Sequence, residues 1–260
     1  MLHQPHRNPL AAGLALLFLA SVAGCQAAAS LTLAGREFLS NGITDGGAAF
    51  QLVPGTRVRL GFTDANITAQ AGCNTFGAAY RIEAGRLVVD GGAMTEMGCD
   101  EPRNQQDQWL FAFLGSKPAA TLAGTDLTLD NGRTVIRLVD RTIAEPDRNI
   151  VGPTWTVTSI IDGGAVSSVP AGVTASLIFN DDGTVEVNAG CNRGRGSWVA
   201  EGTGITFRDV ALTKMACDGP AGALENAVVA VLHAGAVQAS IRASTLTLQA
   251  GNKGIQLTGS

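Results

Sequence analysis

Several segments of the chain alternate between large apolar residues and smaller or polar residues with a period of two. In the second half these segments are Trp155–Ile160, Ala175–Phe179 and Val185–Val187. Alternation with this period predicts short β-strands that bury one face. The runs Asp162–Gly164 and Asn180–Gly183 contain residues that readily adopt positive φ, so we expect tight turns between these strands.

One segment in each half departs from this pattern and has helical spacing. In the second half, Asp218 offers a capping side chain and Pro220 suits a first helical turn. Apolar residues then recur at helical spacing, with Glu225 off their face and Gly235 as the expected end. These apolar residues are Leu224, Val228, Val231 and Leu232, and their counterparts after Asp100 and Pro102 are Gln106, Leu110, Phe113 and Leu114.

Two more strands are expected after the first helix. Leu127–Leu129 and Thr134–Leu138 are separated by Asp130-Asn131-Gly132, which is a strong hairpin signal. Each half therefore predicts a sheet or small barrel together with one helix, and the fold class is α+β, mainly β.

The cysteines reveal an internal repeat. Cys73 and Cys99 are 26 positions apart, and so are Cys191 and Cys217, which lie 118 residues further on. The surrounding residues match at the same offset: Ala71-Gly72-Cys73-Asn74 with Ala189-Gly190-Cys191-Asn192, Thr95 with Thr213, Met97 with Met215, Asp100 with Asp218, and Pro102 with Pro220. Ordered matches of this number indicate a duplication. We expect two tandem small β-barrel-like domains at residues 31–140 and 152–260, joined by a polar linker at 141–151.

The first residues have the pattern of an export signal. An apolar run, Leu10–Ala20, is too short to span a bilayer and fits the hydrophobic region of a signal peptide. The following Val22-Ala23-Gly24-Cys25 resembles a bacterial lipobox, which implies removal of residues 1–24 and a lipid anchor on Cys25. Because Gln26 rather than Asp follows the cysteine, the resemblance implies the outer membrane of a Gram-negative cell, facing the periplasm. The alternative is an ordinary signal peptide with a cysteine nearby.

Charge argues against one class of partner. The formal net charge is −4, and the sequence contains no basic patch. A nucleic-acid partner is therefore not expected.

The 33 glycines and the 5% aromatic content are typical of many short strands joined by turns.

These features together resemble the META domain, also called the HslJ-like family. Its pattern is a tryptophan-led first strand, a Gly-Cys-Asn corner and a Thr-x-Met-x-Cys segment before a helix. The corresponding residues are Trp155, Asn74 and Asn192 within the corners, and Thr95-x-Met97-x-Cys99 and Thr213-x-Met215-x-Cys217, while Phe38 replaces the tryptophan in the first copy. The resemblance implies a small barrel crossed by a helix, a bacterial envelope lipoprotein, a link to heat shock or envelope stress, and no established catalytic activity.

The four remaining cysteines are expected to form structural disulfides within each domain, Cys73–Cys99 and Cys191–Cys217, because the periplasm is oxidising. A redox pair, crossed pairing and free thiols are the alternatives, although no Cys-x-x-Cys spacing is present. A metal site lacks further imidazole or thiolate ligands, since His233 stands alone in the second helix and is expected at its surface.

The other motif residues also have a structural interpretation. Asn74 and Asn192 are expected to bond the backbone of a tight corner, with a ligand-facing role as the alternative. Met97 and Met215 are expected to pack in the core. The acidic run Asn180–Gly183 lacks the spacing of a calcium loop and is expected to be a hairpin turn.

No nucleophile paired with a base, phosphate loop or zinc-protease motif is present, so we expect no enzyme, no cofactor and no catalytic residues. The leading hypothesis is a non-catalytic envelope lipoprotein that binds a periplasmic protein or a small ligand, in a stress-related role. The alternatives are a protease inhibitor or secretion pilot that acts on one protein partner, and an enzyme with a site between the two copies.

Overall fold

The computed structural model describes residues 31–260, so the predicted signal peptide (residues 1–24) and Cys25 lie outside the described part. Both halves of this part are mainly β, as expected. Within the same range, no helix combines the length and apolar character needed to cross a bilayer.

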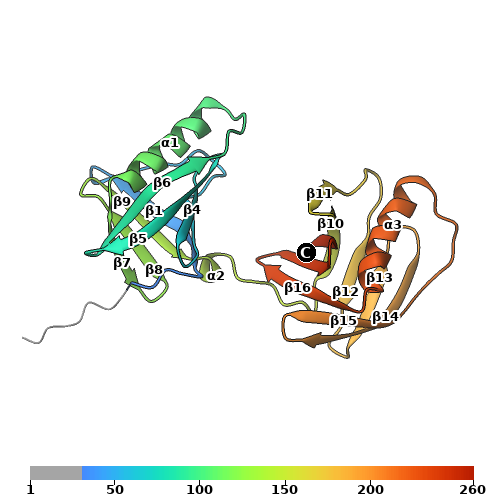
Figure 1. The fold of residues 1–260 in the computed structure, drawn as a ribbon. Helices are drawn as coiled ribbons and strands as arrows, with labels where there is room; N and C mark the ends of the chain where they lie inside the picture. Colours follow the sequence, from blue (N-terminus) through green and yellow to red (C-terminus); the bar gives the residue numbers. More distant parts are fainter. Residues whose placement is uncertain (1–30) are drawn as a thin grey trace, which may run out of the picture. The chain divides into compact units, whose positions relative to one another are not determined.

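The first domain is a closed antiparallel barrel (Figure 1). Its strands follow one another around the ring, and the first pairs with the last, so that eight of the nine strands close the barrel. The remaining strand, β2, only extends β1 as a hairpin. The strands are β1 (Glu37–Asp45), β2 (Ala48–Ala49), β3 (Arg59–Phe62), β4 (Asn66–Gln70), β5 (Thr75–Glu83), β6 (Arg86–Met94), β7 (Ala119–Ala123), β8 (Asp126–Asp130) and β9 (Thr134–Asp140).

The second domain repeats this topology strand for strand. Its ring closes through pairing of β10 with β18, and β11 is the extra hairpin strand. The strands are β10 (Thr154–Asp162), β11 (Ala165–Ser168), β12 (Ser176–Phe179), β13 (Thr184–Asn188), β14 (Arg193–Glu201), β15 (Gly204–Leu212), β16 (Ala236–Arg242), β17 (Thr245–Ala250) and β18 (Lys253–Gly259). The prediction of two tandem barrels is confirmed.

One helix interrupts each barrel at the same place in the strand order. Helix α1 (Glu101–Gly115) joins β6 to β7, and α3 (Gly219–Leu232) joins β15 to β16. The predicted apolar faces are buried in both helices, including the amide of Gln106. A further short helix, α2 (Arg141–Ala144), begins the segment that the sequence assigned to the linker.

The predicted helix starts differ in one detail. Asp100 caps α1 by accepting a hydrogen bond from the amide of Arg103, as expected. Asp218 is the N-cap residue of α3 but makes no capping side-chain bond, so this part of the prediction is wrong for the second copy. Gly219 has φ +61°, where the first copy has Glu101. We attribute the missing bond to this different path of the backbone into the helix.

The barrel cores contain equivalent residues at equivalent places. Phe38 pairs with Leu60 as Trp155 pairs with Leu177, and both aromatic side chains are fully buried. Phe38 therefore fills the place of the tryptophan that leads the second copy. Equivalent residues differ in number by 117 up to the end of β3 and β12, and by 118 in the cysteine motifs that follow. The extra residue lies in the next turn, because residues 63–65 connect β3 to β4 whereas residues 180–183 connect β12 to β13.

Candidate functional site

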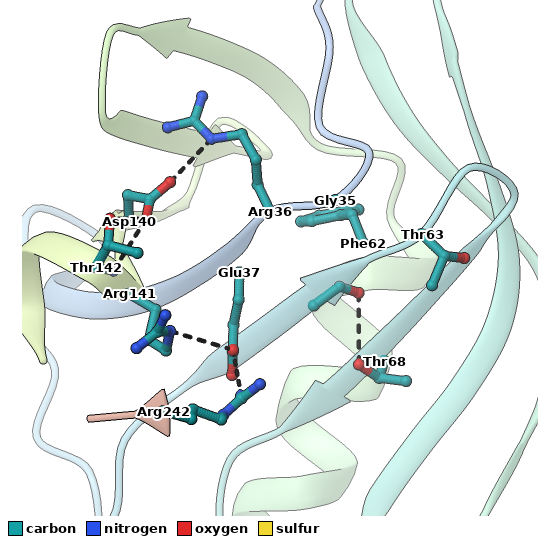
Figure 2. Close-up of a pocket in the computed structure, with 11 residues that line it drawn as sticks. Gly35, Arg36, Glu37, Phe62, Thr63, Thr68, Asp140, Arg141, Thr142 and Arg242 are labelled. Atoms are coloured by element: carbon teal, nitrogen blue, oxygen red, sulfur yellow. Dashed lines mark hydrogen bonds and ion pairs between the residues drawn. The ribbon is translucent and has the colours of Figure 1, made fainter. Parts of the chain in front are cut away.

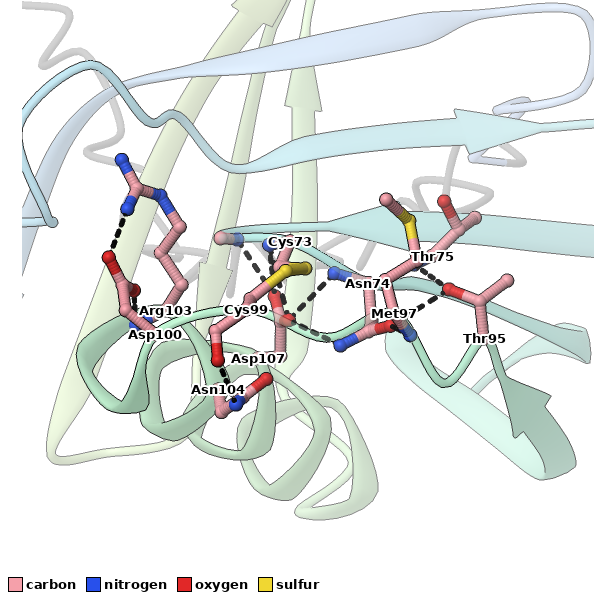
Figure 3. The surroundings of a disulfide bond; sticks show 11 residues. Cys73, Asn74, Thr75, Thr95, Met97, Cys99, Asp100, Arg103, Asn104 and Asp107 are labelled. Atoms are coloured by element: carbon pink, nitrogen blue, oxygen red, sulfur yellow. Dashed lines mark hydrogen bonds and ion pairs between the residues drawn. A yellow bond between two sulfur atoms is a disulfide. The ribbon is translucent and has the colours of Figure 1, made fainter.

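The motif residues of the first copy meet in one hydrogen-bonded corner (Figure 3). Asn74, only 6% exposed, lies at its centre. Its Oδ1 accepts hydrogen bonds from the Thr95 hydroxyl (3.0 Å) and from the Met97 backbone amide (2.8 Å). The asparagine therefore holds the Thr-x-Met-x-Cys segment against the start of β5, which is the backbone-bonding role expected from the sequence.

The second copy repeats this arrangement. Asn192 is 3% exposed, and its Oδ1 accepts from the Thr213 hydroxyl (2.7 Å) and the Met215 amide (2.8 Å). Its Nδ2 donates to the Met215 carbonyl oxygen at 3.1 Å. In each copy the side-chain oxygen of the asparagine accepts from both a threonine hydroxyl and a methionine backbone amide. The asparagine therefore joins the Gly-Cys-Asn corner to the Thr-x-Met-x-Cys segment.

A carboxylate from the helix completes each corner, and the sequence analysis did not assign it. Asp107 of α1 accepts from the backbone amides of Gly72 (2.8 Å) and Asn74 (2.7 Å) and from that of Cys73. Glu225 of α3 accepts from the Asn192 amide (2.8 Å) and from its Nδ2 (2.9 Å). The two acidic residues differ in number by 118, the offset of the repeat, and this match was the signal that could have identified them.

The glycine of the motif has a steric explanation in the first copy. A Cβ atom at Gly72 would lie 2.6 Å from the carbonyl oxygen of Arg103, closer than real Cβ contacts. A side chain here would push the corner away from α1 and weaken the bonds to Asp107.

The cysteine pairs form the expected disulfides. Cys73 bonds to Cys99 and Cys191 to Cys217, with Cα atoms 6.4 and 6.1 Å apart. Each bridge links the Gly-Cys-Asn corner to the end of the Thr-x-Met-x-Cys segment, next to the asparagine bonds. The same two segments are therefore joined covalently and by hydrogen bonds.

One cluster within residues 31–260 has the residue types of a metal site. Ligand atoms of Cys191, Cys217 and Glu225 lie within 4.8 Å of one another. Metals bind the thiolate form of cysteine, and here both sulfurs belong to the disulfide. The cluster could therefore hold a metal ion only after reduction of the bridge.

The prediction that the motif methionines pack in the core is wrong. Met97 is 61% exposed and Met215 is 59% exposed. Each methionine donates its backbone N–H inward to the corner asparagine, and its side chain lies on the outer side of the segment. The hydrogen bond thus decides which side of this chain segment faces solvent.

Two further apolar side chains are partly exposed beside the corner asparagine of the first copy. Met94 is 40% and Phe111 is 48% exposed, and the Phe111 ring packs edge-on against Phe76 at 4.8 Å between centroids. Both border a depression of about 10 Å³ that Asn74 also lines. This volume is about that of a single water, so the depression has no room for a ligand on Asn74.

A second polar region lies at the ends of β1 and β9 in the first domain (Figure 2). Arg36 donates to the Asp140 carboxylate at 2.9 Å, and Arg59 donates to Glu37 at 2.7 Å. Partial burial opposes ionisation of Asp140, but hydrogen bonds from Thr142 and Arg36 outweigh it and lower the pKa of this carboxyl group. These charges pair with one another and hold the ends of the strands together.

Two remaining predictions are confirmed. His233 is exposed at the end of α3, as expected for a helix-surface residue. Residues 180–183 form the turn between β12 and β13, and Asp182 accepts from the backbone amide of Thr184 at 2.8 Å and from its hydroxyl at 2.6 Å. These bonds from Thr184 lower the pKa of Asp182 and occupy the carboxylate in the turn.

Comparison with known proteins identifies the same two units. The family model described as the META domain matches residues 31–142 and again residues 148–259. Among solved structures, an NMR structure of a protein from Burkholderia xenovorans is 23% identical and has a TM-score of 0.37, covering 43% of this chain and 83% of that one. A second NMR structure is 21% identical with a TM-score of 0.34, covering 41% and 90%. No curated protein matches the chain.

Proposed function

The chain belongs to the META domain family, with one copy over residues 31–142 and another over 148–259, and from this premise we propose that it is a non-catalytic, lipid-anchored envelope protein that binds a protein partner. The anchor in this proposal is Cys25, which follows a signal segment and a lipobox-like sequence. A multiply acylated cysteine provides stable membrane attachment, which a single fatty chain does not. We place the protein at the outer membrane, facing the periplasm, in a stress-related role.

The observation that supports binding is the pair of exposed methionines. Met97 and Met215 occupy the same motif position in the two copies, and about three-fifths of each side chain is exposed. Methionine is polarisable and adapts to varied apolar surfaces, which suits it to protein contacts. Burial of such a side chain stabilises a complex by up to about 1.5–3 kcal/mol.

The surrounding network supports a rigid presentation of these side chains. The asparagine, the disulfide and the helix carboxylate fix the backbone on both sides of each methionine. A fixed contact residue loses less conformational entropy on binding than one on a free loop. Two such contacts on one tether would also raise the overall affinity through effective concentration.

Affinity capture with crosslinking from intact envelopes tests the proposal. The wild-type lipoprotein is compared with Cys25→Ala, and with Met97→Ser and Met215→Ser combined, before and after heat stress. Ile143→Ser is the matched control, because Ile143 is 58% exposed and its loss removes apolar surface of similar exposure outside the motif. We expect one partner to be enriched with the wild type and the control, and lost with the double methionine variant.

Three results would contradict the proposal or part of it. Equal enrichment with the double methionine variant would show that binding does not use these side chains. A purified protein that turned over a substrate, with loss of turnover on substitution of one named residue, would establish an enzyme instead. Retention of Cys25→Ala in the membrane fraction would remove the lipid-anchor part of the proposal.

A further inference from the structure

The second domain has a pocket between its helix α3 and the strand pair that closes its barrel. The pocket has a volume of about 250 Å³ and lies between α3 and the strands β10 and β18. Its wall is mostly apolar and is made by Ala223, Ala227 and Ala230 of the helix and by Ile160, Ile161 and Gly254 of the strands. Small side chains on the helix leave this space open.

The first domain fills the corresponding place with aromatic rings. Trp109 of α1 is equivalent to Ala227 of α3. The two differ in number by 118, and each directly precedes a buried residue of its helix, Leu110 or Val228. Phe50 lies opposite Ile43, where the second domain has Ser167 opposite Ile160. Trp109 and Phe50 stack with ring centroids 4.6 Å apart and an angle of 13° between the ring planes.

The two copies therefore differ in an aromatic pair that is present in the first domain and absent from the equivalent place in the second. The second domain has Ala227 and Ser167 in place of Trp109 and Phe50, so two aromatic side chains are absent while the strand register around them is the same. In the first domain this space is filled by the flat side chains of Trp109 and Phe50, which lie nearly parallel to each other. A flat aromatic molecule is thus the shape that complements the open pocket of the second domain.

The volume and the rim define the ligand further. An apolar cavity of about 150 Å³ accepts one benzene molecule, so a pocket of 250 Å³ has room for a one- or two-ring compound. The pocket is also bordered by Asn226 and by the ion pair between Lys253 and Asp162, whose N–O distance is 2.6 Å. An apolar pocket with a few polar groups at its edge is the usual form of a small-molecule site.

We propose that the pocket between α3 and the β10–β18 edge binds a small planar aromatic molecule, with a polar substituent directed at the Asn226, Asp162 and Lys253 rim. This site is separate from the exposed methionines and does not depend on the protein-binding role proposed above. Only the second copy would have it, because Trp109 and Phe50 occupy the place in the first copy.

The test uses 5-fluoroindole, whose ring system is that of the Trp109 side chain, in a fluorine NMR titration of the full chain without its signal segment. We expect saturable binding to one site in the wild type. Ala227→Trp, which restores the residue of the first copy, should abolish this binding. Val229→Phe is the matched control, because it introduces the first-copy residue Phe111 on the same helix outside the pocket and should leave the affinity unchanged.

A second variant makes the test independent of any folding defect in Ala227→Trp. Trp109→Ala combined with Phe50→Ser removes both rings from the equivalent place in the first domain and should raise the stoichiometry from one site to two. The proposal is overturned if wild type and Ala227→Trp bind equally, or if the wild type shows no saturable binding. Binding of a tryptophan-containing peptide but not of the free ring would likewise overturn the small-molecule assignment in favour of a protein side chain.

Discussion

The corner of the second domain predicts a strongly pH-dependent effect of one isosteric substitution. In Asn192→Asp the retained oxygen still accepts from Thr213 and Met215. The amide nitrogen that donates to Glu225 and to the Met215 carbonyl oxygen becomes an oxygen, 2.9 Å from a carboxylate oxygen of Glu225. Two charges at this distance would repel by about 6 kcal/mol at an effective dielectric constant of 20. It costs less for one of the two carboxyl groups to keep its proton at pH 7. That pH is about three units above the usual range of a carboxyl group, which corresponds to about 4 kcal/mol.

The folded variant should therefore bind one more proton than the unfolded chain near neutral pH. One of the two carboxyl groups has a higher pKa in the folded variant than in the unfolded chain. The loss of stability is therefore absent below about pH 4 and grows as the pH increases. We expect a loss of stability of up to about 4 kcal/mol at pH 7, decreasing by about 1.4 kcal/mol for each pH unit towards pH 4.

Denaturant unfolding followed by the fluorescence of Trp155 and Trp198 measures this loss, in a Trp109→Phe background that removes the first domain's tryptophan signal. The double variant Asn192→Asp with Glu225→Gln is the control. It exchanges donor and acceptor, so that the glutamine amide donates to the new carboxylate while its oxygen still accepts from the backbone amide at position 192. Its stability should recover the part of the loss that comes from the contact with residue 225, leaving about 1–3 kcal/mol for the unrestored bond to the Met215 carbonyl oxygen.

Three results would refute the reasoning. One is a stability of Asn192→Asp at pH 7 equal to that of the wild type. Another is a penalty that does not change between pH 4 and pH 7, because this would mean that no proton is taken up. The last is a failure of Glu225→Gln to restore the double variant, which would show that the contact between these side chains is not the source of the loss.

Three further predictions concern stability. Replacement of Cys73 and Cys99 by serine should cost up to about 3.5 kcal/mol and lower the thermal midpoint of the first domain, and an unchanged midpoint would mean that the bridge adds nothing to the corner's hydrogen bonds. Trp155→Ala should cost about 3–5 kcal/mol in denaturant unfolding because this side chain is fully buried, and a loss below 1 kcal/mol would show that the core collapses to fill the space. Asp140→Asn should cost about 1–2 kcal/mol at pH 7. Because the folded pKa of Asp140 lies below its ordinary value of 3.8, this contribution is present above that value and is lost as the pH falls through the folded pKa, so a difference from the wild type that did not shrink with decreasing pH below 3.8 would contradict it.

Local patterns in the sequence were sufficient for the elements and for the repeat. Alternation with a period of two identified strands such as β10 and β12, and helical spacing identified the buried face of α3. The repeated cysteine spacing predicted both disulfides. These inferences succeed because a side chain's position along a strand or helix already fixes which face it shares with its neighbours.

The chemistry of the site depended on contacts between distant segments. The sequence identified Asn74 and Asn192 as corner residues, but periodicity only placed Glu225 off the apolar face of its helix. Its partner was invisible because it lies 33 residues earlier in the chain. Met97 and Met215 were misplaced for a related reason, since a short apolar residue pattern does not reveal that the backbone N–H must point inward to an asparagine.

By itself the sequence determined a duplicated, mainly β chain with one helix and one pair of cysteines in each copy, because composition, periodicity and spacing are local properties. The tertiary structure alone decided that β1 pairs with β9 and β10 with β18, that the helix carboxylates complete the corners, and that the methionines face outward. It also decided that the change from Trp109 to Ala227 opens a pocket in one copy only. Each of these outcomes depends on which surfaces meet when the chain closes on itself, and that meeting is set by packing across the whole domain.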